Sequence, residues 1–443
     1  MQTSFSLAQL ADPNIAEADA ILRSCVHCGF CTATCPTYVL LGDENDSPRG
    51  RIYMIKEMLE HSEPARREVV KHIDRCLSCL GCMTTCPSGV HYMHLVDQAR
   101  VHVEKTYRRP FLDRLIRSRL AGVMTDPRRF RRALFAAMLA KPLAGLLELV
   151  GLKPLAAMLR LAPARLPGRG AVEPGVFAAH GPRRGRVALL SGCVANVLAP
   201  EINVAAIQVL TRHGYEVVLA HGEGCCGSLA HHMGREDEAL TAARQNVDAW
   251  IREIDRDGLD AILTTASGCG TTMKDYGFML RRDQAYAGNA ARVAGLTQDI
   301  CEFVHNIKYL KYVLRPPLRV AYHPACSLAH GQRVTLAPKH LLSEAGFTVK
   351  DIPESHLCCG SAGTYNMLQP ELANRLRDRK IANIDKVTPE LIAAGNIGCI
   401  TQIAAGTEIP VVHPIELIEW ATGGSAPKAL RGGVRADAFG KRS

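Results

Sequence analysis

Two kinds of hydrophobic patterning divide the chain. In the first hundred residues, apolar positions recur at helical spacing: Ile52, Ile55 and Leu59 follow the N-cap pair Ser47 and Pro48. This pattern predicts an amphipathic helix with one buried face. Further helices are predicted at 15–22, 64–74 and 91–103. From residue 184 onward, short apolar runs alternate with longer helical segments, which is typical of an α/β sheet.

The α/β part contains an internal repeat. Strands are predicted at 186–190, 215–220 and 261–265, with helices at 200–213 and 236–254 between them. The series begins again with a strand at 319–322 and includes a helix at 371–384. We therefore expect two related α/β units.

A basic segment separates the helical part from the α/β part. Residues 108–170 hold 14 Lys and Arg against three acidic residues. Prolines at 110, 127, 142 and 154 limit each helix to a few turns. Short basic amphipathic helices fit a membrane-surface contact or a docking face for a partner subunit. They also fit a linker that packs on its own protein. The Pro- and Gly-rich stretch 165–175 predicts a hinge.

Two cysteine runs near the N-terminus share the spacing C-x2-C-x2-C-x3-C-P. In bacterial ferredoxins this spacing delivers three thiolates to one [4Fe-4S] cube, and the fourth Cys ligates the other cube of the pair. The expected ligand sets are Cys25, Cys28, Cys31 with Cys86, and Cys76, Cys79, Cys82 with Cys35.

Other uses of paired cysteines fit less well. Zinc needs four ligands, whereas each run carries a third and fourth Cys at ferredoxin spacing, followed by Pro. A disulfide framework needs an oxidising compartment, and the first 20 residues lack the basic and apolar regions of a secretion signal. We therefore expect two [4Fe-4S] clusters in a cytoplasmic protein.

Each α/β unit carries a second cysteine pattern, with a Cys at a strand end, a Cys-Cys-Gly 32 residues later and one more Cys after the next strand. Cys193 and Cys326 are 133 residues apart, as are Cys225 and Cys358. Carboxyl ends of parallel strands meet at one sheet edge, so these thiols can converge there. We interpret them as a further metal or redox site where the two halves face each other; buried structural thiols are the alternative. The eight residues are Cys193, Cys225, Cys226, Cys269, Cys326, Cys358, Cys359 and Cys399.

These motifs carry a family resemblance over nearly the whole chain. The two repeats resemble the cysteine-rich CCG domain found in heterodisulfide reductases and in flavin-linked dehydrogenases. Together with the ferredoxin-type runs and the Ser47 to Arg51 stretch, they resemble the iron–sulfur subunits of glycolate oxidase, with relatives in lactate and glycerol-3-phosphate systems. The resemblance implies a multidomain α+β fold: a mainly helical two-cluster domain at 1–107, a basic linker at 108–182, and CCG repeats at 183–316 and 317–443.

The repeats depart from the full CCG pattern at one position each. That pattern ends in C-x2-C, but Ala266 and Asn396 replace the first Cys of the pair. Four thiolates remain per repeat, enough for a cubane cluster, for zinc, or for no metal. Cys301 lies outside the pattern and is predicted to be a buried core thiol. The nearby His323 and His356 offer possible ligands, but we interpret each as a satisfied core or surface histidine.

The resemblance implies an electron-transfer subunit. No GxGxxG follows a strand, so we place FAD on partner subunits and none on this chain. A partner flavoprotein would oxidise glycolate, and D-lactate, and electrons would pass through two [4Fe-4S] clusters to a quinone or other membrane acceptor. The chain would lie in the cytoplasm, peripheral to the inner membrane.

Three other functions stay open. They are a heterodisulfide-reductase-like enzyme with the CCG domain as catalyst, the iron–sulfur subunit of a lactate or glycerol-3-phosphate dehydrogenase, and an interaction module that only holds the flavin subunits. Nucleic-acid binding is not expected, because the aromatic content is only 5%. Arg49 and Arg51 are either solvated, or tune a cluster potential, or contact an acidic partner.

Overall fold

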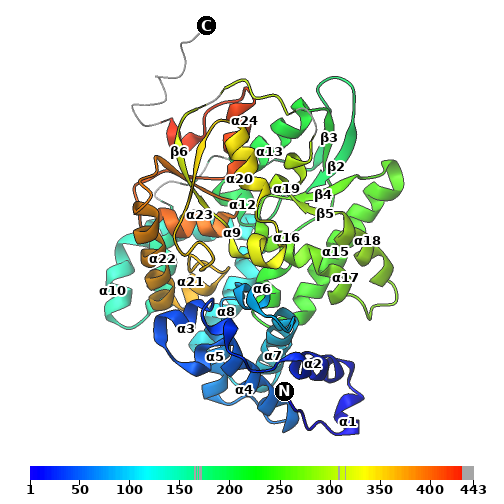
Figure 1. The fold of residues 1–443 in the computed structure, drawn as a ribbon, viewed down its shortest axis with the longest axis vertical. Coiled ribbons are helices and arrows are strands. Elements are labelled where there is room, and N and C mark those ends of the chain that lie inside the picture. Colours follow the sequence, from blue (N-terminus) through cyan, green and yellow to red (C-terminus); the bar gives the residue numbers. More distant parts are fainter. Residues whose placement is uncertain (164–165, 167, 169–171, 308–309, 315, 432–443) are drawn as a thin grey trace.

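The computed structural model describes residues 1–163, 166, 168, 172–307, 310–314 and 316–431. The N-terminal helices lie at one end of the molecule and the two α/β repeats at the other, with the helices of the basic segment beside both (Figure 1). This layout confirms the predicted α+β multidomain class.

The N-terminal part is a helical module with its own core. Leu22, Ile55, Ile73 and Leu95 are fully buried there. Ser47 caps the central helix by accepting the Gly50 amide at 3.0 Å, as the sequence predicts. The helices are α1 (Leu7–Leu10), α2 (Pro13–Ser24), α3 (Pro36–Leu41), α4 (Pro48–Glu60), α5 (Arg67–Asp74), α6 (Gly81–Thr85) and α7 (Tyr92–Thr106). Helix α5 begins three residues later than expected.

The basic segment forms four helices. They are α8 (Phe111–Met124), α9 (Pro127–Ala140), α10 (Ala144–Leu149) and α11 (Lys153–Leu161). Prolines occupy the first turns of α9 and α11, where no intrahelical N–H bond is lost. Arg109 and Arg117 both bind Asp74 of α5, at 2.7 and 2.9 Å, so part of this charge holds the segment to the N-terminal module. Among the described residues, no helix combines the length and apolarity needed to span a bilayer.

The first repeat contains a five-stranded sheet in the order β1-β3-β2-β4-β5, in which only β1 is antiparallel to its neighbour. Its strands are β1 (Gly175–Phe177), β2 (Gly185–Leu189), β3 (Tyr215–Leu219), β4 (Ala261–Thr264) and β5 (Thr297–Asp299). Its helices are α12 (Ala195–Leu198), α13 (Pro200–Arg212), α14 (Ser228–His232), α15 (Glu236–Asp257), α16 (Ser267–Lys274), α17 (Tyr276–Met279), α18 (Ala287–Leu296) and α19 (Ile300–His305). Residues 165, 167 and 169–171 of the predicted hinge lie outside the described residues.

The second repeat has a parallel four-stranded sheet in the order β7-β6-β8-β9, which matches β3-β2-β4-β5 of the first. Its strands are β6 (Arg319–His323), β7 (Thr348–Asp351), β8 (Leu391–Ala394) and β9 (Val411–Val412). Its helices are α20 (Ala337–Glu344), α21 (Tyr365–Leu368), α22 (Pro370–Asp385), α23 (Ile397–Ala404) and α24 (Pro414–Ala421), with a π-helical turn at Ser327–Gly331. The matching strand orders show the internal repeat in three dimensions.

One hydrophobic core joins the two repeats. Helix α13 of the first repeat packs on α24 of the second, and α19 packs on α20, so the contacts are exchanged symmetrically. Val187 and Leu189 of β2 share this core with Val320 and Tyr322 of β6. The opposite sheet faces are covered by separate cores. The joint fixes the strand ends of both repeats, and hence their cysteines, relative to each other.

Candidate metal centres

The first cysteine loop lies at the surface of the N-terminal module. The four thiols expected to hold the first cluster all line one small cavity; they are Cys25, Cys28 and Cys31 of this loop and Cys86 of the second. Cys82 of the second loop also reaches this cavity. Cys28 is exposed, and its neighbours Val26 and Phe30 are 67% and 64% exposed. Burial and nearby Cys25 raise the pKa of Cys31 to about 11, so this thiol must lose a proton to bind iron.

The second loop is buried between the module and the second repeat. Cys35, Cys76, Cys79 and Cys82 are all at most 9% exposed. Burial, with smaller contributions from neighbouring thiols that include Cys35 and Cys76, raises the pKa of Cys79 and Cys82 well above the ordinary value. The expected second ligand set is therefore buried, and its thiols lie near enough to influence one another's pKa.

Both loops contain left-handed backbone at matching positions. His27 and Gly29 have φ of 54° and 85° in the first loop, and Ser78 and Leu80 have φ of 48° and 61° in the second. Such conformations cost energy for residues with a side chain and cluster at functional sites. Gly29 adopts this conformation readily because it has no side chain, whereas in the second loop a leucine, Leu80, adopts it.

A buried charge network stands beside the second loop. Arg51 of α4 is 1% exposed; its guanidinium lies 3.7 Å from Cys35 Sγ and donates to Asp46 Oδ1 at 3.2 Å. Asp46 also accepts from Arg75 at 2.7 Å and lies 3.0 Å from His72 Nδ1. Asp46 and His72 are thus already paired, and we assign them no metal. The positive charge next to Cys35 suits an anionic iron–sulfur cluster.

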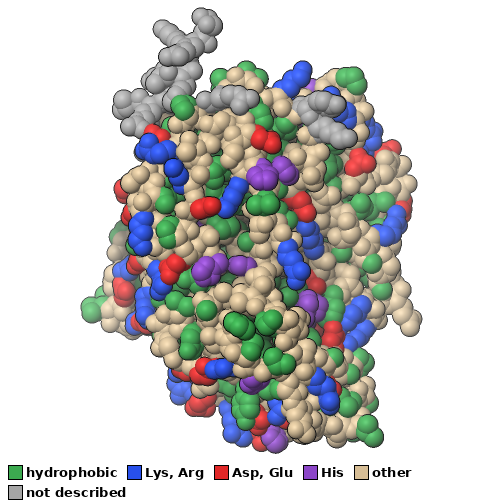
Figure 2. Space-filling view, in the orientation of Figure 1, with side chains coloured by type: hydrophobic (Ala, Val, Ile, Leu, Met, Phe, Trp, Pro, Cys, Tyr) green, Lys and Arg blue, Asp and Glu red, His purple; other side chains and the backbone are tan. Residues whose placement is uncertain are grey.

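The second loop contacts the CCG turn of the second repeat. Leu77 and Cys79 share a small hydrophobic core with Cys358, Tyr365 and Ala373. The boundary is closed by Thr84 Oγ1, which lies 2.8 Å from His330 Nδ1. Histidine side chains gather along this boundary on the face that Figure 2 draws. The ferredoxin-type module is therefore packed against the second cysteine constellation.

Seven of the eight CCG thiols line one cavity; Cys359 is not among its lining residues. This cavity of about 160 Å³ between the repeats is lined by Cys193, Cys225, Cys226, Cys269, Cys326, Cys358 and Cys399. The Cys193 thiol donates to the Cys225 sulfur at 3.6 Å, which lowers the pKa of Cys225 to about 3 and raises that of Cys193. Sγ of Cys326 lies 3.8 Å from Sγ of Cys358. These close pairs of sulfurs are a donor set for a thiophilic metal.

The glycine of each CCG motif is required by the backbone. Gly227 and Gly360 have φ of 84° and 91°. A Cβ at Gly227 would lie 3.0 Å from Ala239 O, and a Cβ at Gly360 would lie 2.4 Å from Ala373 O. The turn can therefore press against α15 or α22 only when it ends in glycine, and this contact positions the two preceding cysteines, of which Cys225, Cys226 and Cys358 line the cavity.

The remaining predicted residues, Cys301, His356 and His323, differ in their burial and hydrogen bonding. Cys301 is 1% exposed within the joint core, as predicted. His356 is an exposed surface residue. His323 is buried, but neither ring nitrogen has a hydrogen-bond partner among the described residues, so the interpretation of a satisfied core histidine is wrong. Sequence reasoning favoured satisfied partners because a lone His before a turn gives no sign of what faces its ring.

A large apolar pocket was not foreseen from the sequence. It has a volume of about 620 Å³ and is lined by residues of α8, α9 and α11, among them Leu115, Phe130 and Met158. Its lining also includes Met124, Val194, Gly363, Ile397 and Gly398, which line the thiol cavity too. The two cavities are therefore neighbours. Only the clustering of apolar residues between arginines in 108–163 could have indicated the pocket.

The geometry agrees with what known proteins show. The 4Fe-4S dicluster domain family matches residues 21–90, and the cysteine-rich domain family, CCG, matches residues 187–274 and 320–404. A crystal structure of a hypothetical protein from Helicobacter pylori has a similar fold, with a TM-score of 0.53 at 9% identity over 94% of this chain and 74% of that one.

Two curated relatives match over almost their whole length. The glycolate oxidase iron-sulfur subunit of Escherichia coli (strain K12) is 42% identical over 95% of this chain and 99% of its own. The probable glycolate oxidase iron-sulfur subunit of Bacillus subtilis (strain 168) is 30% identical over 91% of this chain and 94% of its own. With both domain types present and coverage nearly end to end, the chain belongs to the family of glycolate oxidase iron–sulfur subunits.

Proposed function

We propose that this chain is the electron-transfer subunit of a flavin-dependent 2-hydroxy-acid dehydrogenase complex that oxidises glycolate to glyoxylate, and D-lactate in the same way. The observation that carries the proposal is the pair of ferredoxin-type cysteine loops in a chain similar from end to end to glycolate oxidase subunits. The partner subunit holds the FAD that takes the hydride, since this sequence has no dinucleotide-binding fingerprint.

The cluster ligands follow from the cysteine positions. Cys25, Cys28, Cys31 and Cys86 hold one [4Fe-4S] cluster, and Cys35, Cys76, Cys79 and Cys82 hold the other. When bound, the two clusters supply one-electron carriers between a two-electron flavin and a distant acceptor. The chain's own contribution is to exclude water from the second set, and Arg51 provides a positive charge beside Cys35. The domain limits 107, 182 and 316 remain predictions.

The exposures of the two loops suggest the direction of transfer. The first loop is open to solvent and flanked by the exposed apolar side chains of Val26 and Phe30, which suits contact with the flavin subunit. The second loop is buried against the CCG turn of the second repeat. Electrons would enter at the exposed loop and leave at the repeat side of the molecule.

The acceptor we propose is a membrane quinone. The 620 Å³ apolar pocket suits an isoprenoid quinone, and it adjoins the thiol cavity. Around the pocket, α8 to α11 expose apolar side chains such as Phe135, Leu146 and Leu149 among arginines. Helices of this kind lie at the surface of an anionic membrane. The chain would thus lie at the cytoplasmic face of the inner membrane.

The test uses the full complex purified without oxygen. About eight iron and eight acid-labile sulfide per copy of this chain are expected, four for each cluster, and glycolate should bleach the cluster absorption. Cys28→Ser should lower the iron count and stop cluster reduction, while Cys301→Ser, a buried thiol outside both sets, should leave both unchanged. Flavin reduction by glycolate with clusters that stay oxidised, or glycolate oxidation by this chain alone, would contradict the proposal.

A further inference from the structure

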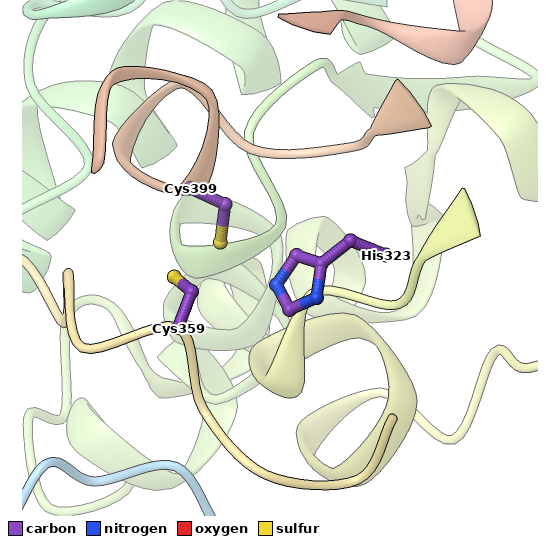
Figure 3. Close-up of side chains that lie close together, drawn as sticks. All are labelled: His323, Cys359 and Cys399. Carbon is purple, nitrogen blue, oxygen red and sulfur yellow. The ribbon is translucent and has the colours of Figure 1, made fainter. Parts of the chain in front are cut away.

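A buried imidazole and two buried thiols meet in the second repeat (Figure 3). His323 ends β6, Cys359 belongs to the CCG turn, and Cys399 lies in the first turn of α23. One ligand atom from each lies within 4.8 Å of the others, and all three residues are at most 3% exposed. Figure 3 shows both sulfurs and the ring directed toward one another.

The imidazole lacks any other partner within the described part of the chain. Both ring nitrogens of His323 are buried there without a hydrogen bond. Leaving a buried polar group unpaired is destabilising, so a folded protein normally supplies a partner. Among the described residues nearby, the groups that face this ring are the two sulfurs, and a metal ion between ring and sulfurs would satisfy all three.

The spacing suits one ion better than a cluster. Ligands of a single tetrahedral zinc, at about 2.0–2.3 Å from the metal, stand close to one another. The thiolates of a [4Fe-4S] cube bind four different irons and therefore stand farther apart. We propose that His323, Cys359 and Cys399 bind one Zn²⁺ ion. Cys358, whose thiol contacts Cys359 but is not within 4.8 Å of all three ligand atoms, moves in to complete the tetrahedron.

The charge of the residues around the proposed site suits a zinc ion with three thiolate ligands. Zn²⁺ with three thiolates and a neutral imidazole carries one negative charge. Lys380 of α22 is 2% exposed, and its ammonium, which donates to the carbonyl oxygens of Glu354 and Ser355 at 2.8 and 3.5 Å, lies in the field of Cys358, Cys359 and Cys399. This buried cation offsets the charge of the site.

The described residues of the first repeat form no such site. Val187 of β2 and Val320 of β6 are equivalent positions, because they hold the same register in their sheets. His323 follows Val320 by the same number of residues as Leu190 follows Val187, so Leu190 is its counterpart. Ala239 and Ala373 are equivalent positions, because each contacts the glycine of the CCG turn in its own repeat. Lys380 follows Ala373 by the same number of residues as Asn246 follows Ala239, so Asn246 is its counterpart. The neutral side-chain amide of Asn246 donates a hydrogen bond to the Cys225 carbonyl oxygen at 3.0 Å. The two repeats are therefore unequal, and zinc belongs to the second alone.

The test is metal analysis of the full chain, purified without oxygen with its iron–sulfur clusters intact. Wild type should retain one zinc per chain, and His323→Gln and Cys399→Ser should each lose it. The matched controls are His356→Gln, an exposed histidine three residues from Cys359, and Cys269→Ser, the first-repeat counterpart of Cys399; both should keep the zinc. Growth with Co²⁺ should give thiolate-to-cobalt absorption in wild type and not in His323→Gln.

His323→Cys separates metal binding from folding, because a thiolate can replace the imidazole and should restore the zinc. Zinc that persists in His323→Gln, or a wild-type chain that holds no zinc when supplied with it, would overturn the assignment. So would iron in this site, seen as a count well above that of two clusters. The assignment does not rest on the proposed electron-transfer function, since zinc and iron are counted separately.

Discussion

Two neighbouring arginines of α4 have different surroundings. Arg49 and Arg51 lie close together in the sequence, which allows both the same three roles: a solvated residue, one that tunes a cluster potential, or one that contacts an acidic partner. In the structure, Arg49 is partly exposed and pairs with Glu44 at 2.7 Å, while Arg51 is enclosed by Asp46, Thr37 and Cys35. Arg49 also lines the cavity of the first thiol set and donates to the His27 carbonyl oxygen at 3.4 Å, so each arginine lies beside one loop, and of the two only Arg51 is buried.

Arg51→Leu should lower both stability and one reduction potential. Removing one partner of a buried ion network costs about 3 kcal/mol, measurable by urea unfolding. A reduced cluster carries more negative charge than an oxidised one, so losing a nearby cation disfavours reduction. A redox titration followed by electron paramagnetic resonance should show one of the two potentials shifted downward. Arg66→Leu, which removes an exposed arginine paired with Glu63, is the control, and equal potentials in the two variants would contradict this role for Arg51.

Gly360→Ala should destabilise the second repeat. The added methyl would meet the Ala373 carbonyl at 2.4 Å with φ at 91°, so we expect a loss of about 2 kcal/mol in unfolding free energy. Gly122→Ala, in the interior of α8 with open space around it, should be neutral or slightly stabilising. Equal midpoints in chemical denaturation for the two variants would show that the turn tolerates a side chain.

At the level of elements, α8 to α11 combine two functions. Their inner side packs on the protein, through Arg109 and Arg117 on Asp74 and through Leu120 and Leu134 in a local core. Their outer side keeps apolar residues exposed, and α10, at the left of Figures 1 and 2, carries Leu146 and Leu149 at 58% and 84% exposure. The linker and the membrane-contact interpretations of this segment are thus compatible.

Binding of the whole chain to anionic lipid vesicles should depend on this segment. Reversing Arg128 and Arg132, both exposed on α9, should weaken co-sedimentation by at least about thirtyfold, at about 1 kcal/mol for each charge lost near the surface and more for its reversal. Leu149→Ser should weaken it further by removing inserted apolar area. Reversing Arg292, half exposed on α18, is the control. Unchanged sedimentation of the α9 variant would exclude the membrane contact.

At the level of the whole molecule, an acidic residue connects the module to the first repeat. Asp97 of α7 is 4% exposed and lies 3.2 Å from His231 Nε2 of α14; it also accepts from Arg100 at 3.2 Å. Burial alone would raise the pKa of Asp97, but the two histidines of α14 hold it well below its usual range. Burial alone would lower the pKa of His231, but Asp97 raises it above 6.5.

This contact should weaken as the pH rises. A group with a raised folded pKa stabilises the fold fully below its unfolded pKa of about 6.5 and loses that contribution as the pH passes its folded pKa. Wild type should therefore lose stability above pH 6.5 relative to His231→Gln, measured as melting temperature from pH 6 to 9. Hydrogen exchange should locate the change at α7 and α14. Parallel pH profiles of the two proteins would exclude the pair as its cause.

The sequence by itself determined the local chemistry of this protein. Spacing alone specifies which three thiols of each ferredoxin-type loop can reach one cluster, because a loop of seven residues has few conformations. The 133-residue offset specified the repeat and its thiols at strand ends, and Ser47 with Pro48 specified the start of α4. These features depend on neighbours in sequence, or on a sheet rule that holds for any parallel α/β unit.

Only the tertiary structure decided which of these local sites meet. It placed the Cys79 loop against Cys358, buried Arg51 rather than Arg49, and directed His323 at Cys359 and Cys399. It also built the apolar pocket from α8 to α11 together with residues of both repeats. Contacts between residues so far apart in the chain depend on how whole elements pack, because packing selects one arrangement among many that the same local patterns allow.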